Sequence, residues 1–124
     1  MKRITTGSPF EAAYAFSRAV VKGDWCFVSG VTGYDYATMT MPEDAAAQTH
    51  NCFTTIAQVL DEAGFAMADV VRVQYTLTDA ALMEQVASEL RAALGDVAPA
   101  ATMVVAGLVR PEMLIEIEVT AFRG

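Results

Sequence analysis

The fold is decided by the stretch at residues 113–122, which reads MLIEIEVTAF. Apolar and polar side chains alternate along it, and a period of two places successive side chains on opposite faces of a strand. One face carries Ile115, Ile117 and Val119. The other face carries Leu114, Glu116, Glu118 and Thr120. The pattern predicts a strand over 113–122 with one face turned to a core.

Three more elements can be recognised on the N-terminal side of this strand. Residues 71–77 alternate in the same way and predict a strand. Residues 82–94 carry apolar side chains at helical spacing, which predicts a helix. Residues 100–107 are mostly small or β-branched, which favours a strand. A turn containing Pro111 separates that strand from the last one.

A longer helix is expected earlier in the chain. Thr40-Met41-Pro42-Glu43 has the spacing of a capping box, and Gly64 is the expected end of the helix. Further towards the N-terminus, the turn signal at residues 22–24 separates apolar runs at 16–21 and 25–29, which predicts a β-hairpin. A short edge strand near residues 4–6 is expected to precede it, and residues 30–41 to form a loop.

The order of these elements predicts an α+β protein with a mixed sheet. Right-handed crossovers would place both long helices on one face of that sheet. The other face would then be covered by nothing from its own chain, although it carries residues such as Val, Met and Leu. An exposed apolar face of this kind usually marks an association surface. We therefore expect a homo-oligomer that buries the helix-free face.

Composition narrows the class of protein. The 124 residues suit one domain spanning residues 1–124, and 54% of them are hydrophobic, so the chain can build a core without a disulfide or a metal. The net charge of -7 argues against a nucleic-acid partner, since phosphate backbones require clustered Lys and Arg. No apolar run is long enough to span a membrane, and a soluble cytoplasmic protein with reduced cysteines is expected.

Most standard catalytic sets are missing from the sequence. His50 is the only histidine, which excludes a two-histidine metal site, and no GxSxG, Walker A or GxGxxG pattern occurs. The remaining candidates are Glu116 and Glu118, two carboxylates on one face of a strand. One interpretation is structural, with the carboxylates bonded at a subunit rim. The other is catalytic, with a carboxylate that orients or deprotonates a water molecule in a cleft.

Four segments resemble motifs of the RidA (YjgF) family, in the order in which the family carries them. Residues 14–19 (YAFSRA) resemble its GPYSQA segment, and residues 27–30 (FVSG) resemble its strand ending in SGQ. Residues 99–102 (PAAT) resemble its PAR[ST] motif, and residues 114–121 (LIEIEVTA) resemble its VEIEAIA ending. The first helix and the strand after it are also similar, so the resemblance covers nearly the whole chain.

The resemblance implies a chorismate-mutase-like fold, with a six-stranded mixed sheet and two helices on one face. It also implies a homotrimer with a small-molecule cleft between neighbouring subunits. Deaminating members of the family hydrolyse reactive enamines or imines, such as 2-aminoacrylate, to keto acids and ammonia. The motif arginine grips the substrate carboxylate and the first Glu of EIE, here Glu116, orients the water. The resemblance implies neither a metal nor an organic cofactor.

The departures from the family pattern concern the cleft. The motif arginine is replaced by Ala101, the family tyrosine by Phe16, and the glutamine after SG by Val31. Alanine cannot bind a carboxylate, so small α-imino acids should bind poorly. Arg18 stands at the family glutamine position and would replace the missing cation if it reaches the cleft; otherwise it is a surface or ion-paired arginine. The other expected ligand-binding residues are Ser29, Tyr34, Tyr36, Thr102 and Met103.

Two hypotheses follow for the function. The first is a hydrolytic deaminase for an enamine or imine other than 2-aminoacrylate or 2-iminopropanoate, with Glu116 as the catalytic residue. The second is a non-catalytic trimer of the same fold that binds a metabolite in its cleft. Some relatives are named as ribonucleases, but the negative charge and the lack of a basic patch argue against that activity.

Overall fold

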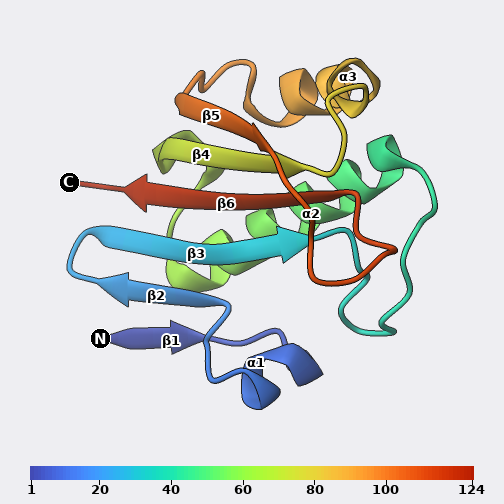
Figure 1. The fold of residues 1–124 in the computed structure, drawn as a ribbon. Coiled ribbons are helices and arrows are strands. Elements are labelled where there is room, and N and C mark those ends of the chain that lie inside the picture. The colour runs from blue at the N-terminus through green and yellow to red at the C-terminus, as the bar shows by residue number, and fades with distance from the viewer.

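The computed structural model describes residues 1–124 and contains one mixed six-stranded sheet, as the sequence predicts (Figure 1). The spatial order of the strands is β1-β2-β3-β6-β4-β5. Neighbours are antiparallel except β4 and β5, which run parallel. The strands are β1 (Lys2–Ile4), β2 (Ala19–Lys22), β3 (Trp25–Thr32), β4 (Val70–Leu77), β5 (Ala100–Val105) and β6 (Ile115–Phe122). The strand predicted from its alternation, β6, therefore lies at the centre.

Two long helices cover one face of the sheet, and α2 runs behind the strands in Figure 1. The helices are α1 (Pro9–Ala13), α2 (Ala45–Ala63) and α3 (Leu82–Leu94), with a 3₁₀ turn η1 at Met67–Asp69. Helix α2 begins after Asp44, whose carboxylate accepts a hydrogen bond from the Ala47 N–H at 2.6 Å. It ends at Gly64, whose left-handed φ of 85° is the conformation that glycine adopts at no steric cost.

The core lies between this sheet face and the helices. Ile115, Ile117 and Val119 of β6 are at most 3% exposed, which confirms that the predicted apolar face is the buried one. Helix α2 contributes side chains at helical spacing, which include Cys52, Ile56, Val59 and Leu60. Both cysteines are free and buried, and burial raises the pKa of each thiol, so neither is a reactive nucleophile.

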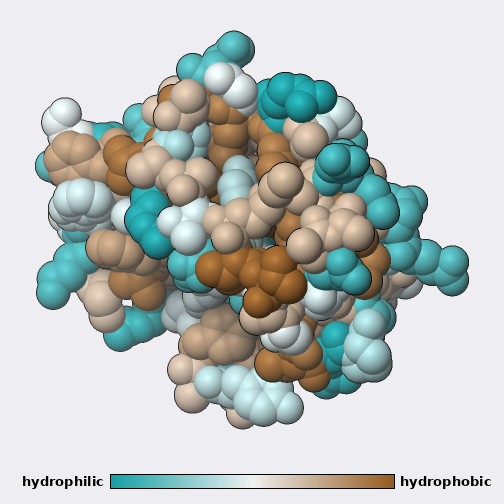
Figure 2. All heavy atoms as spheres, turned by 45° about the horizontal axis from the view of Figure 1, so that its top comes forward, coloured by the Kyte–Doolittle hydropathy of each residue, from teal (hydrophilic) through white to brown (hydrophobic).

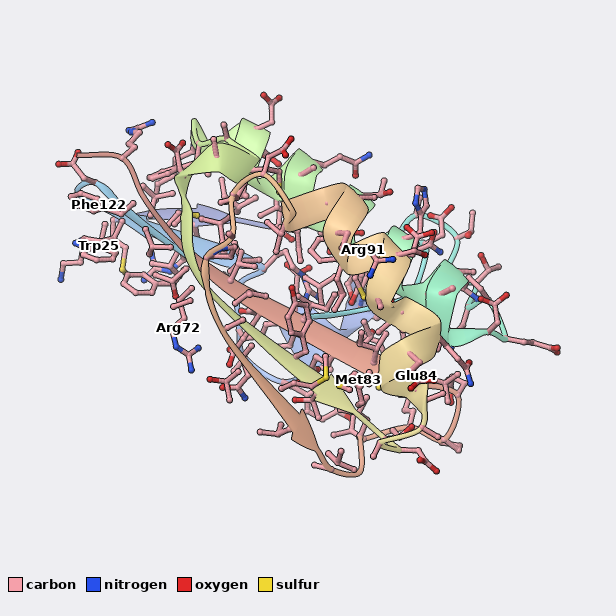
Figure 3. The ribbon with its side chains drawn as sticks, turned by 90° about the horizontal axis from the view of Figure 1, so that it is seen from above. Trp25, Arg72, Met83, Glu84, Arg91 and Phe122 are labelled. Carbon is pink, nitrogen blue, oxygen red and sulfur yellow. The ribbon has the colours of Figure 1, made fainter.

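The helix-free face of the sheet is partly apolar and partly polar. Trp25, Phe27 and Phe122 are 41%, 48% and 37% exposed, and the Trp25 and Phe122 ring centroids are 4.6 Å apart. Figure 2 shows hydrophobic atoms reaching the surface in patches on the side that carries β5 and α3. In Figure 3, Trp25, Phe122 and Arg72 project away from the helices. Val104 of β5 is also exposed on this face, as expected for valine, whereas Met103 lies on the opposite face of β5 and packs against the core.

Several predicted boundaries were wrong for local reasons. Helix α2 is capped by Asp44, not by a box at residues 40–43. Helix α1, which was not predicted, begins at Pro9 after the Ser8 cap and is too short to show periodicity. Strand β2 begins at Ala19 and not at residue 16.

Strand β3 continues to Thr32, through residues that were expected to form a loop. A bulge between Val28 and Val31 gives β3 one residue more than β6 at this point, which keeps both valines on the buried face. The extra residue puts Ser29 and Gly30 beside the site described next.

Candidate functional site

A cavity of about 500 Å³ opens where α1, β3, the start of β6 and the β5–β6 connection meet. Its walls are largely aromatic and apolar, with two arginines and one carboxylate among them. The lining residues are Phe10, Tyr14, Phe16, Arg18, Gly30, Thr32, Tyr36, Val109, Arg110, Met113 and Glu116. The volume and the mixture of apolar walls with a few charged groups are typical of a small-molecule site.

Glu116 is the carboxylate of this cavity and is half-buried. Burial raises its pKa, and the negative charge of Glu118 on the same strand face raises it further, while Arg18 acts in the opposite direction. Its side chain packs directly on Gly30, where a Cβ would lie 2.6 Å from the Glu116 Cδ and 2.8 Å from Oε1. Gly30 is therefore what leaves room for the carboxylate in this position.

Arg18 lies in the wall of the same cavity and is only 1% exposed. Its Nη1 donates a hydrogen bond to the Gly30 carbonyl at 2.8 Å. Its Cζ is 4.6 Å from the Tyr36 ring centroid and 5.4 Å from that of Phe16, distances at which a cation is attracted to an aromatic face. The buried guanidinium thus ties the start of β2 to the bulge beneath Glu116.

A second buried carboxylate, Glu11 of α1, compensates the charge of Arg18. Glu11 Oε2 is 3.7 Å from Arg18 Nε, which has no hydrogen-bond partner. The Thr5 hydroxyl donates to Glu11 at 2.6 Å, and the Thr6 hydroxyl and its N–H donate as well. Burial raises the pKa of Glu11, but these hydrogen bonds and the charge of Arg18 outweigh burial, so the net pKa is lowered. Glu11 is therefore ionised at neutral pH.

The structure brings four of the predicted site residues together, namely Phe16, Arg18, Tyr36 and Glu116. Tyr36 is fixed by its hydroxyl, which accepts a hydrogen bond from the Thr32 N–H at 3.0 Å. Arg18 shares the cavity with Glu116, but its ion pair is with Glu11.

The other predicted residues lie outside this cavity. The Ser29 hydroxyl donates to the Ser17 carbonyl at 2.7 Å, and the Tyr34 hydroxyl donates to Glu112 at 2.7 Å. Burial and the hydrogen bond to Glu112 raise the pKa of Tyr34 to about 12, so this phenol stays protonated. Within one chain, β4 separates Ala101, Thr102 and Met103 of β5 from β6 and Glu116.

Arg110 is the main residue that reasoning from sequence missed. It belongs to the β5–β6 connection, which was recognised only as a turn because of Pro111. Arg110 lines the cavity, and its Cζ lies 4.8 Å from the ring centroid of Phe10. Phe10 and Tyr14 were missed because α1 was not predicted. No local signal marks these residues, since the segments meet only in the folded chain.

The site offers general acid–base chemistry by one carboxylate near two guanidinium groups. No cluster of three or more His, Cys, Asp or Glu side chains is placed to hold a metal ion. None of the helices is both long enough and apolar enough to cross a lipid bilayer.

Comparisons with known proteins agree with the fold and with the motifs. The family model for endoribonuclease L-PSP matches residues 6–123. An uncharacterised protein of Streptomyces coelicolor is 30% identical over 125 residues, covering 100% of this chain and 93% of that protein. A RutC family protein of Pyrococcus abyssi is 32% identical over 112 residues, covering 87% of this chain and 86% of that protein.

Solved structures show the same arrangement of elements. Rv2704 of Mycobacterium tuberculosis, described as a member of the YjgF/YER057c/UK114 family, is 35% identical with a TM-score of 0.89 and covers 98% of both chains. RidA from an Antarctic Psychrobacter is 28% identical with a TM-score of 0.89, covering 99% of this chain and 100% of that one. The chain therefore belongs to the endoribonuclease L-PSP family, the family of the YjgF, RidA and UK114 proteins that its motifs resemble.

Proposed function

We propose that this protein is a homotrimeric hydrolytic deaminase that converts an enamine or imine metabolite to a carbonyl compound and ammonia. The observation that carries the proposal is Glu116, a half-buried carboxylate with a raised pKa that faces a cavity of about 500 Å³. A carboxylate whose pKa is nearer to neutrality is a stronger base when ionised and a usable acid when protonated. A merely structural carboxylate would instead be held by hydrogen bonds, as Glu11 is.

The reaction needs only water and this carboxylate. The imine reacts as its protonated iminium form. Glu116 takes a proton from water while the water oxygen bonds to the iminium carbon, and the π electrons of the C=N bond move to the nitrogen, which gives a neutral carbinolamine with an NH2 group. Glu116 then returns its proton to this nitrogen. The C–N bond breaks as Glu116 accepts the proton of the hydroxyl group and the C=O bond forms, and ammonia leaves and takes that proton from Glu116 as ammonium. The charge of Arg18 near the carboxylate helps to keep enough of it ionised at neutral pH.

The substrate should differ from the smallest imino acids. The side chain of Ala101 offers no hydrogen-bond donor on β5, where the resemblance to the family places an arginine. The cavity walls are rich in aromatic rings, so a larger and more apolar substrate gains more from desolvation here. The family description names a ribonuclease, but a net charge of -7 is unfavourable for an RNA-binding protein.

The helix-free sheet face supports a homo-oligomer, and the resemblance to the RidA family makes a trimer the assembly that we propose. Its aromatic cluster of Trp25, Phe27 and Phe122 is exposed in the single chain, and such patches are typical of association surfaces. Strand β5 is an exposed edge, so a neighbouring protomer can meet it there. In the trimer, Ala101, Thr102, Met103 and Ser29 would border the cleft between protomers. Light scattering should give the mass of three chains, and the mass of one chain would contradict the assembly.

A non-catalytic binding trimer is the second candidate. It is favoured by one observation: the polar side chains near Glu116 are already committed, with Ser29 bonded to Ser17 and Arg18 paired with Glu11. A protein with so few free catalytic groups can bind a ligand without turning it over. Under this candidate, a stable keto acid would stabilise the protein against heat although no ammonia is released from any imine.

The test is to generate imines in situ with an amino-acid oxidase and to follow the loss of the imine and the release of ammonia. The substrates should range from the imine of alanine to those of leucine and phenylalanine. Wild type should accelerate hydrolysis of the larger imines, and Glu116→Gln should abolish the effect. Glu84→Gln is the matched control, because Glu84 is an exposed carboxylate of α3 outside the cavity (Figure 3). Equal rates for wild type and Glu116→Gln would refute the catalytic proposal.

A further inference from the structure

Arg110 is a cation of the cavity that has no anionic partner. It is exposed, and it lines the same cavity as Glu116. The ion pairs of the structure are Arg18–Glu11 and His50–Glu89, so no carboxylate lies within 4.0 Å of the Arg110 guanidinium. Its Cζ is 4.8 Å from the ring centroid of Phe10. Stacking of this kind uses the flat face of the guanidinium and leaves its N–H edges free for an anion.

The turn that carries Arg110 is held in place by hydrogen bonds to a buried glutamine side chain. Gln48 is fully buried on α2, and its Nε2 donates to the Glu112 carbonyl at 2.9 Å and to the Pro42 carbonyl at 2.8 Å. Its Oε1 accepts from the Leu114 N–H at 2.9 Å. Two residues of the turn, on either side of Met113, are thereby fixed to the helix. Arg110 therefore sits on a positioned segment, which lowers the entropy cost of binding a ligand.

The neighbouring carboxylate does not neutralise Arg110. Glu112 accepts a hydrogen bond from the Tyr34 hydroxyl at 2.7 Å, and this bond lowers the pKa of Glu112 more than Arg110 does. Arg110 is exposed and has no ion-pair partner, whereas Arg18 is buried and forms an ion pair with Glu11. Of the two guanidinium groups in the cavity, only Arg110 is thus available to a bound anion without breaking an existing ion pair.

We propose that Arg110 binds the carboxylate of the ligand, and that the ligand is a 2-imino or 2-keto acid with an aromatic or large apolar side chain. A planar carboxylate fits the N–H fork of arginine. The side chain would lie among the rings of Phe10, Tyr14, Phe16 and Tyr36, which provide the flat apolar walls of the cavity. This inference rests on the proposed function for the imine substrate, but the binding site can be tested without turnover.

The test compares phenylpyruvate with its neutral analogue benzyl methyl ketone by isothermal titration calorimetry. Wild type should bind phenylpyruvate more tightly than the ketone. Arg110→Gln should weaken phenylpyruvate binding by about tenfold to a hundredfold, the loss of one charge-assisted contact, and should leave the ketone unaffected. Arg91→Gln is the matched control, since Arg91 is an exposed arginine of α3 that lies outside the cavity (Figure 3). It should bind both compounds as wild type does.

Three results would overturn the inference. The first is that wild type does not bind phenylpyruvate. The second is that wild type and Arg110→Gln bind phenylpyruvate with equal affinity. The third is that Arg110→Gln loses affinity for the ketone and for phenylpyruvate to the same extent. The outcome is separable from the deaminase proposal. Binding that depends on Arg110 without any turnover would refute only the deaminase, and turnover that is indifferent to Arg110 would refute only this inference.

Discussion

Replacing Gly30 by alanine should remove activity while leaving the fold nearly unchanged. The added Cβ would lie 2.6 Å from the Cδ of Glu116 and 2.8 Å from its Oε1. Carbon atoms in contact need roughly 3.5 Å, so the carboxyl group must move by about 1 Å. A displacement of about 1 Å at the reacting group can lower a rate by roughly a hundredfold. We expect a loss of this size in the rate of ammonia release.

The stability effect of Gly30→Ala should be small. The atoms in the way belong to the far end of a flexible side chain, so the backbone of β3 need not shift. Crowding of Glu116 destabilises the variant, whereas alanine reduces the entropy of the unfolded chain. These opposing effects should leave the free energy of unfolding within about 1 kcal/mol of wild type.

Turnover and urea unfolding of the same preparations test this reasoning. Gly107→Ala is the matched control, because a Cβ at Gly107 would meet nothing within 4 Å. In a Glu116→Ala background, the Gly30 substitution should no longer be destabilising, since the crowded group is absent. Full activity of Gly30→Ala would refute the argument. An equal destabilisation by Gly30→Ala with and without Glu116 would refute it as well.

Three further predictions concern the buried polar groups. Glu11→Gln should lower the free energy of unfolding by about 3 kcal/mol at pH 7, because it leaves the charge of Arg18 buried and unpaired. The folded-state pKa of Glu11 is lowered, so ionised Glu11 stabilises the fold above the ordinary value of 4.5, and this stabilisation is lost as the pH falls through the folded pKa. Urea titrations at several pH values should therefore show that the free energy of unfolding falls less steeply at acid pH in the variant than in wild type. Gln48→Leu should cost roughly 3 kcal/mol by leaving three backbone groups without a partner, and thermal unfolding that matches wild type would contradict this. Glu116→Gln should raise the free energy of unfolding at neutral pH. The raised pKa of Glu116 stabilises the fold below pH 4.5, and this stabilisation is lost as the pH rises through the folded pKa, whereas glutamine carries no charge to bury. A variant that is no more stable than wild type at pH 7 would count against the raised pKa.

Much of the fold could be predicted because its signals are local. Alternation in β6 identified the buried face through Ile115 and Ile117, since the period of a strand is fixed by its backbone. Helix α2 and its end at Gly64 followed from helical spacing and from the left-handed turn that glycine allows. The bulge in β3 was missed because an extra residue is visible only in the register with a partner strand.

The candidate site was predicted only in part, for a related reason. Glu116 stood out because a carboxylate on a central strand is costly to bury. The partner of Arg18 was not identified, because Glu11 lies on a five-residue helix whose place against β2 is decided by tertiary contacts. Arg110 was missed because nothing within a turn indicates that it faces a cavity built from α1 and β3.

The pH dependence of ammonia release is the most direct test of Glu116 as the catalytic base. The raised pKa of Glu116 predicts an acid limb whose midpoint lies above the ordinary carboxyl value of 4.5. Glu118→Gln should move this midpoint to lower pH, because it removes the like charge that raises the pKa, and Glu116→Gln should remove the limb together with the activity. An unchanged midpoint in Glu118→Gln, or a limb that survives in Glu116→Gln, would contradict the assignment.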